Sequence, residues 1–501
     1  MVLALASIGC ALTVLDTNVV GIVLPSIARD LHASFAGVEW VVSAYVLMFA
    51  ALLLPAGVIA DKHGRKRVFQ IGVAFFGVAS LACGLAPSAA ALILARACQG
   101  VGAAFLIAPA LAIIGNRFQA EKERAHAWAV WGTVMGLTMV LAPIIGGLIG
   151  STFGWRWAFY INVPICAALL SVVPSLVDES CDPHPRTLDV PGMALFVVAM
   201  LLLTVGLILG PRAGWTSIQV LGSWLAGAAV FVVFTKVEKA RTHPMLDLSL
   251  FGRWPFVGAV TAMFAYASSA QVMASLLPLY LQGANGRGPV MAGVAMLPFA
   301  LAMLLFPHVG RFLGKVWPGY RILTLGLAAV GVGNALVFVA ARYDGDTLLV
   351  VAMAILGAGG GLLNGETQKA VMSSVPTERA GMASGISTTS RFTGILLGFS
   401  GLGALLASRT RAIIEQDVSL RESTGVSLSS DQVDRVIAGD TGWSAATAGP
   451  HELNDILQRL QHDYAHAFST VFLVAAVVAF IASAVVLTAM RSRQVTQGAR
   501  S

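Results

Sequence analysis

The sequence predicts an all-α membrane protein with fourteen spanning helices. Hydrophobic residues make up 57% of its 501 residues, whereas Asp, Glu, Lys and Arg together make up 11%. A soluble globular chain carries about 25% charged residues, so this chain has too few of them to cover a water-facing surface. Its apolar residues also gather in stretches of roughly 20, the length at which a helix crosses a bilayer. Collagen-like, disordered and coiled-coil classes are excluded.

Polar residues, glycines and prolines separate the expected spans. In chain order these are 2–24, 40–60, 68–86, 89–115, 127–150, 157–177, 190–209, 218–236, 255–281, 290–313, 322–341, 348–371, 383–406 and 467–490. The first stretch carries Asp16 at its middle and leads directly into the second, so we expect a retained span rather than a cleaved signal peptide. No Lys or Arg precedes Arg29, which suggests that a short cytoplasmic leader has been trimmed.

The basic residues predict the orientation. Of the 32 Lys and Arg residues, 20 fall on the face that holds both termini, 10 fall on the opposite face, and Arg96 and Arg391 lie inside spans. All of the lysines are on the first face. The positive-inside rule makes that face cytoplasmic, so both termini are expected inside the cell. The net charge of +7 is then an orientation signal, and a nucleic-acid partner is not expected.

Loop lengths predict the domain organisation. An inner loop follows the eighth span, and a long outer loop at 409–466 separates the last two spans. The expected units are a six-helix bundle at 1–177, two additional spans at 178–236, a cytoplasmic loop at 237–254 and a second six-helix bundle at 255–490.

The long outer loop contains apolar residues at helical spacing, namely Leu453, Ile456, Leu457 and Leu460. This spacing predicts a short amphipathic helix. We expect it to pack down as a solvated cap; a docking site for a periplasmic partner is the alternative.

The loop after the second span combines Gly57, Asp61, Gly64 and Arg65. Glycines allow a tight turn between helices, and Asp61 at a helix end can pair with Arg65. With this loop the chain resembles the major facilitator superfamily, and the resemblance implies that these four residues act as a gate. A partial copy of this loop pattern, at 310–321, lies between the tenth and eleventh spans. Two related halves of such a transporter are expected to share the pattern.

The fourth span carries Arg96 and Gln99, and the first carries Asp16 and Asn18. A charge inside a span is a functional candidate by default. The Leu15-Asp16-Thr17-Asn18 sequence and the Arg96 to Gln99 pattern resemble the fourteen-helix drug:proton antiporters, the EmrB/QacA-like group. The resemblance implies proton coupling at Asp16, Arg96 and Gln99 and substrate contact at Asn18. The alternative is a static ion pair that ties the first span to the fourth.

The fifth span ends with Pro143, Gly146 and Gly147, which resemble the antiporter motif of this group and imply a further gating element. Ala142 and Thr138 stand where that motif has glycines and so depart from it. The stretch at 155–164, Trp-Arg-Trp-Ala-Phe-Tyr-Ile-Asn-Val-Pro, is another mark of the group.

In the C-terminal half, the glycine-rich stretch at 357–365 is expected to interrupt the twelfth span. Glu366 lies 11 residues before a turn near Thr377 and Arg391 lies 14 residues after it, so the two should lie at similar depth and can pair. We expect Glu366, Thr388 and Arg391 at the substrate site; the alternative is that Glu366 and Arg391 form a permanent clamp between the twelfth and thirteenth spans. Members of the group that export dications have carboxylates near Thr388, which this chain lacks, so dication selectivity does not carry over.

No Walker loop, zinc-hydrolase motif or serine-hydrolase elbow occurs, and the five cysteines are scattered. We therefore expect no enzyme activity, metal or cofactor. The resemblance implies a monomeric, proton-coupled exporter of amphipathic small molecules in the plasma membrane of a bacterium. The alternatives are a lipid or fatty-acid exporter and a proton-coupled importer; a receptor is the weakest of the alternatives.

Overall fold

The computed structural model describes all residues except 119, 182–188, 242–247, 344, 376–379, 417–432, 435–436, 439–449 and 499–501. The described residues form helices joined by short turns, with no strand among them. Fourteen of its helical segments are long and apolar enough to cross a membrane, which confirms the predicted number of spans. The fold is therefore an all-α polytopic membrane protein.

The helices follow the predicted spans closely and extend past most of them. The first group comprises α1 (Val2–Asp30), α2 (Phe35–His63), α3 (Arg65–Leu85), α4 (Ala89–Arg117), α5 (Glu121–Thr152), α6 (Trp157–Tyr160) and α7 (Asn162–Leu176). Two further helices are α8 (Val190–Ala213) and α9 (Ile218–Ala240), followed by the 3-10 turn η1 (Leu248–Gly252). The second group comprises α10 (Trp254–Tyr266), the π-helix η2 (Ala267–Gln271), α11 (Met273–Gly283), α12 (Pro289–Ala295), α13 (Leu297–Leu313), α14 (Gly319–Tyr343), α15 (Asp346–Ser373), α16 (Ala380–Gln416) and α19 (Pro450–Gly498).

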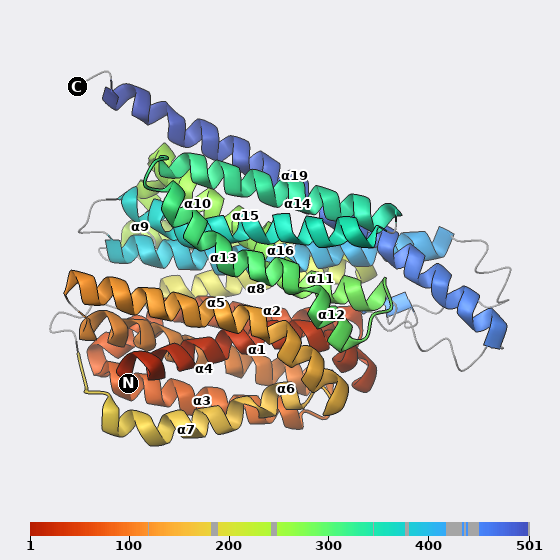
Figure 1. Ribbon diagram of the computed structural model, residues 1–501, viewed down its shortest axis with the longest axis horizontal. Helices are drawn as coiled ribbons and strands as arrows, with labels where there is room; N and C mark the ends of the chain where they lie inside the picture. Colours follow the sequence, from red (N-terminus) through yellow and green to blue (C-terminus); the bar gives the residue numbers. More distant parts are fainter. Residues whose placement is uncertain are drawn as a thin grey trace.

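The helices pack as two groups that lie side by side (Figure 1). In the first, α4 packs on α2 and α3, and α1 packs on α5; in the second, α14 packs on α15 and α19. The paired helices α8 and α9 join the bundle through contacts of α8 with α2 and α16. Glycines permit the close approaches: a β-carbon on Gly102 of α4 would lie 2.6 Å from the backbone nitrogen of Phe76 in α3.

The predicted interruption of the twelfth span is wrong, because α15 runs as one helix through the glycine-rich stretch. The glycines are packing positions instead. A β-carbon on Gly359 would lie 2.7 Å from the carbonyl oxygen of Gly326 in α14, and one on Gly361 would lie 2.9 Å from Phe306 in α13. Their lack of side chains lets α15 lie against both neighbours at once.

The ninth span contains a π-helix, η2, which separates α10 from α11. A π-turn breaks the regular ladder of backbone hydrogen bonds, and a carbonyl freed in this way needs another donor inside a membrane. Asn334 of α14 supplies one, because its Nδ2 donates to the backbone oxygen of Ser269 at 3.0 Å. The sequence analysis did not predict this irregularity.

The bundle has two ends. We call the end with the α2–α3 turn the Arg65 face, and the end with the α5–α6 turn the Trp155 face. The distribution of basic residues predicts that the Arg65 face is cytoplasmic. At the Trp155 face the two groups of helices meet: α11 and α12 reach α1 and α5 (Figure 1), and Gln282 Nε2 donates to the backbone oxygen of Ile22 at 2.8 Å.

The expected amphipathic helix in the outer loop is present but is not separate, because α19 continues from Pro450 into the last span without a break. Of the four apolar residues, the side chain of Leu460 is described and is buried. Tyr464, one turn further along, donates from its hydroxyl group to the backbone oxygen of Ile437 at 2.7 Å. The outer segment around Ile437 therefore packs against α19 near the start of the last span.

Candidate coupling site and transport pathway

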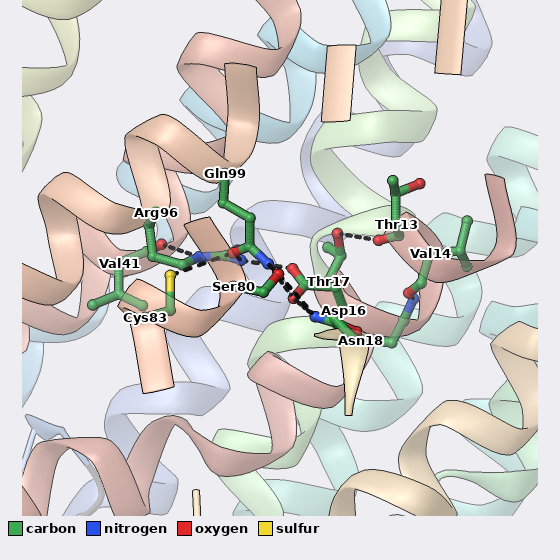
Figure 2. A network of polar contacts seen from close by, with 11 residues as sticks. Thr13, Val14, Asp16, Thr17, Asn18, Val41, Ser80, Cys83, Arg96 and Gln99 are labelled. Atoms are coloured by element: carbon green, nitrogen blue, oxygen red, sulfur yellow. Dashed lines mark hydrogen bonds and ion pairs between the residues drawn. The ribbon is translucent and has the colours of Figure 1, made fainter. Parts of the chain in front are cut away.

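A buried ion pair joins α1 to α4 in the first group of helices (Figure 2). Arg96 Nη1 lies 2.6 Å from Asp16 Oδ2, and both side chains are almost fully inaccessible to solvent. Gln99, one turn after Arg96 on α4, donates from Nε2 to Asp16 Oδ1 at 2.8 Å. The structure thus brings together the three residues that the sequence singled out for proton coupling.

Two further side chains complete this network, and the sequence analysis gave neither of them a role. Asn162, at the start of α7, donates from Nδ2 to Asp16 Oδ1 at 2.9 Å. Ser80 of α3 accepts a hydrogen bond from Gln99 Nε2 at 2.8 Å. The motif at 155–164, which contains Asn162, could have predicted a role for that residue. Nothing in the sequence distinguishes Ser80 from other serines in spans.

Arg96 is held by more than its carboxylate. Its Nε donates to the backbone oxygen of Val41 in α2 at 3.0 Å, and Nη1 also donates to Gln99 Oε1 at 2.6 Å. The guanidinium lies over the ring of Tyr45, 4.2 Å from its centroid. The cation and the carboxylate therefore compensate each other, and both make further hydrogen bonds, which stabilises a buried pair.

Asn18 lies half-buried on α1, and its Nδ2 donates to the backbone oxygen of Val14 at 2.8 Å (Figure 2). It is two residues from Asp16, so it projects to a different side of the helix. The structure does not bring Asn18 into the Asp16 network.

The gate residues lie together at the Arg65 face. Arg65 and Asp61 form the expected pair at 2.8 Å. Gly64 has φ of 107°, a conformation that L side chains rarely adopt, which explains the glycine between α2 and α3. Gly57 lies on α2 near Ala108 of α4.

A residue that the sequence analysis missed secures this turn. Glu179 accepts hydrogen bonds from the backbone N–H groups of Lys66 at 2.9 Å and Arg67 at 3.1 Å. These are free donors at the N-terminus of α3, where an anion is favoured. In this conformation the gate loop is anchored within its own group of helices.

The α5 motif lies at the contact between the two groups. A β-carbon on Gly147 would lie 2.6 Å from the backbone oxygen of Pro289 in α12, and Gly293 of α12 packs directly against the backbone oxygen of Pro143. Gly146 faces α1, where a β-carbon would lie 3.1 Å from the α-carbon of Val19. The motif thus permits backbone-to-backbone packing on two sides of α5.

Glu366 and Arg391, which the sequence analysis allowed to pair, have other partners in this structure. Glu366 lies 3.4 Å from Lys369 Nζ, one turn along the same helix. Arg391 of α16 instead donates from Nε to Gln271 Oε1 at 2.8 Å and from Nη2 to Asn364 Oδ1 at 3.4 Å. A partner one turn away on the same helix is reached locally, so Glu366 does not need the helix opposite.

This arrangement leaves Arg391 bound to neutral amides. Among the described residues it has no carboxylate partner, whereas Arg96 is compensated by Asp16. Thr388 lies half-buried one turn before Arg391 on α16. In this half of the bundle, the arginine inside a span is therefore not compensated by a carboxylate of the described residues. Within the described residues no group of His, Cys, Asp and Glu side chains could hold a metal ion.

Comparison with known families decides the identity. Residues 6–399 match the model of the Major Facilitator Superfamily. The chain belongs to this superfamily. It is accordingly a multi-pass membrane protein that transports small molecules, not an enzyme.

Relatives in actinobacteria carry names of resistance and export proteins. The chain is 34% identical to multidrug resistance protein Stp of Mycobacterium tuberculosis over 83% of its own length and 77% of the relative's. It is 33% identical to the tetracenomycin C resistance and export protein of Streptomyces glaucescens, covering 80% and 75%. It is 28% identical to multidrug efflux pump LfrA of Mycolicibacterium smegmatis, covering 98% and 96%.

Solved structures confirm the fold. A bacterial homologue of the human lysosomal transporter Spinster, in an inward-facing and unoccupied conformation, superposes with a TM-score of 0.67 at 18% identity, covering 97% of both chains. A POT family transporter in complex with 5-aminolevulinic acid superposes with a TM-score of 0.65 at 12% identity, covering 98% of this chain and 96% of the other.

Proposed function

We propose that this transporter exports amphipathic small molecules from a bacterial cell in exchange for protons, as a monomer with both termini in the cytoplasm. The observation that carries the proposal is the buried network of Asp16, Arg96 and Gln99, because intramembrane charges generally mark ion or substrate paths. The names of the relatives support export of drugs. One proton crossing about 100 mV supplies about 2.3 kcal/mol, enough for a modest accumulation ratio.

The hydrogen bonds suggest how Asp16 couples. Oδ2 accepts from Arg96, and Oδ1 accepts from Gln99 and Asn162. Three donors directed at one carboxyl group match its ionised form, since a protonated oxygen would have to donate instead. A proton that binds Oδ1 therefore competes with the hydrogen bonds from Gln99 of α4 and Asn162 of α7, and it removes the charge that attracts Arg96. In the proposed mechanism this loosens α1 from its neighbours and favours the alternate arrangement of the bundle.

The gate residues are proposed to act at opposite ends. Pro143 and Gly147 would form the contact with α12 that closes the Trp155 face, with Gly146 packing α5 on α1 behind them. Gly57, Asp61, Gly64 and Arg65 would close the Arg65 face in the other state. The moving units are those expected from the sequence: bundles at 1–177 and 255–490, joined by the two helices at 178–236 and the cytoplasmic loop at 237–254.

We propose a substrate site between Asn18 of α1 and Arg391 of α16, with Thr388 beside it and Glu366 at its edge. Arg391 has no carboxylate partner in the described part of the chain, which supports binding of anionic or acceptor-rich compounds, because a guanidinium donates well to carboxylates and to oxygen acceptors. The absence of a carboxylate cluster around Thr388 in the described residues argues against selectivity for dications.

Uptake into inside-out membrane vesicles tests the proposed function. A labelled amphipathic compound should accumulate in vesicles when the lumen is acidified, and a protonophore should abolish its accumulation. Accumulation only in right-side-out vesicles would identify an importer. Accumulation of a labelled fatty acid to the exclusion of drugs would identify a lipid exporter. Accumulation that ignores the proton gradient would contradict the proposed coupling.

A further inference from the structure

Glu39 is a buried carboxyl group that the proposed coupling mechanism does not use. It lies on α2, one turn from the end of the helix at the Trp155 face, and its exposed fraction is 1%. Among the described residues, its Oε1 has no hydrogen-bond partner. A buried acidic side chain without a partner is costly, so its position needs an explanation.

The surroundings of Glu39 belong to the contact between the two groups of helices. Its Oε1 packs directly against Gly403 of α16, where a β-carbon would overlap it. One turn deeper, the hydroxyl groups of Ser43 and Ser400 lie 3.2 Å apart. Glu39 therefore sits in a seam between α2 and α16, one turn nearer the Trp155 face than the contact of Ser43 with Ser400.

The charged and titratable groups on the helices around α2 do not pair with Glu39. On this side of the bundle they are Arg29 and Asp30 on α1, Tyr45 on α2, Cys83 on α3, Arg96 on α4, Arg212 on α8, and Arg409 and Arg411 on α16. Arg96 pairs with Asp16, Arg411 and Arg212 pair with Asp434, Asp30 pairs with Arg156, Arg29 bonds to Ser26, and Arg409 is exposed.

No ion pair within the described part of the chain therefore joins Glu39 to a cation. The N-terminal dipole of α2 does not replace one, because its effect falls off within the first turn and Ser34 already caps that end through the N–H of Gly37. A carboxyl group deprived of both water and a cation persists in its neutral form.

We propose that Glu39 binds a proton from the solution at the Trp155 face, and that this proton permits α2 and α16 to close that face. When the seam opens, water reaches the carboxyl group and ionises it at neutral pH. When the seam closes, the carboxyl group must be protonated again. The proton enters and leaves on the same side, so Glu39 carries no net charge across the membrane; it makes closure depend on acidity at that face.

The direction of this dependence follows from linkage. The closed form binds one more proton than the open form, so acid favours closure and alkali favours opening. Within the range where the two forms differ in protonation, each pH unit changes the ratio of open to closed protein by up to about tenfold. The role of this pH dependence in transport rests on the proposed function. In an exporter, the Trp155 face closes after the compound has been released, and protons outside the cell would promote that closure.

Cysteine accessibility tests the proposal without any substrate. Ser400→Cys places a thiol one turn below Glu39 in the seam, and Ser151→Cys places one on the exposed end of α5 at the same face. Intact cells are treated with an impermeant maleimide at external pH values from about 5.5 to about 8. The labelling of Ser400→Cys is divided by that of Ser151→Cys, which corrects for the pH dependence of labelling at an exposed thiol. Labelling of Ser151→Cys also confirms that the face is outside.

With native Glu39, the labelling ratio should rise roughly fivefold or more from acid to alkaline pH. Glu39→Gln, a neutral side chain of the same size, should hold the ratio at its acid value throughout. Glu39→Asp, which still titrates, should restore a rising profile and shows that the site tolerates substitution. A native ratio that does not change with pH, a Glu39→Gln profile equal to the native one, or a Glu39→Gln ratio that is high throughout would each overturn the proposal. All of these outcomes are measured by cysteine labelling and do not depend on export activity.

Discussion

Gly147 of α5 packs against the backbone carbonyl of Pro289 in α12, and a β-carbon on Gly147 would lie 2.6 Å from that oxygen. The contact joins the two groups of helices at the Trp155 face, where Gly293 makes the reciprocal approach to Pro143. Backbone atoms cannot swing aside as a long side chain can. The position therefore reports directly on whether the face is closed.

Gly147→Ala should destabilise the closed Trp155 face by about 1–3 kcal/mol, the usual cost of overpacking. Gly132→Ala is the matched control, because it lies on the same helix with open space around its α-carbon and brings the same gain in helix propensity. Maleimide labelling of Ser400→Cys should increase in the first variant and not in the second. Equal labelling in both variants would mean that this packing does not hold the face closed.

Asp16→Asn should abolish gradient-driven export, because an amide cannot bind and release the proton, while binding of the compound is largely retained. The amide oxygen can still accept from Arg96, so the variant should fold; losing the charge of a buried pair costs up to about 3–5 kcal/mol. Asp346→Asn provides the control, since Asp346 is an exposed carboxylate paired with Arg287. The measurements are uptake into inside-out vesicles and equilibrium binding. Full export by Asp16→Asn would remove Asp16 from the mechanism.

Glu366 and Arg391 should be energetically independent. Glu366 pairs with Lys369 instead. A double-mutant cycle of Glu366→Gln and Arg391→Gln, measured by thermal unfolding, should therefore give an interaction energy below about 0.5 kcal/mol. The pair with Lys369 is largely exposed on the lysine side, so its own contribution should also be below about 1 kcal/mol. An interaction energy above about 1 kcal/mol between Glu366 and Arg391 would show that they pair in another state of the cycle.

Arg391→Gln should reduce export of anionic compounds about tenfold more than export of cationic ones, the equivalent of about 1.4 kcal/mol. Arg391→Lys retains the charge and should preserve the preference for anions while losing part of the affinity, because lysine cannot bond Gln271 and Asn364 together as the guanidinium does. Competition assays with matched anionic and cationic compounds measure the difference. A uniform loss for both classes would assign Arg391 a structural role.

Labelling of single cysteines should establish the orientation. The native Cys181 is exposed, and its neighbour Ser180 accepts the backbone N–H of Arg65, so Cys181 marks the Arg65 face. In intact cells an impermeant maleimide should label Ser151→Cys, and it should label Cys181 only after permeabilisation. Ser430 of the long outer loop lies outside the described residues, so the exposed Ser151 serves as the labelling position at the Trp155 face. The reverse pattern would invert the topology.

The sequence by itself determined the fourteen spans, the intramembrane candidates Asp16 and Arg96, and the local pair of Asp61 with Arg65. These depend on composition over about 20 residues or on neighbours one helical turn apart, and both are visible in the order of residues. The continuity of α15 was not predicted, because a glycine run can signal either a break or close packing against a neighbour.

Only the tertiary structure decided which distant groups meet. It brought Asn162 and Ser80 to Asp16 and Gln99, left Arg391 with amide partners, and set Glu39 against Gly403. The physical reason is that a side chain within a span has candidate partners on several neighbouring helices. Rotation and depth of each helix select among them, and both are set by how glycines and large side chains of all the helices fit together.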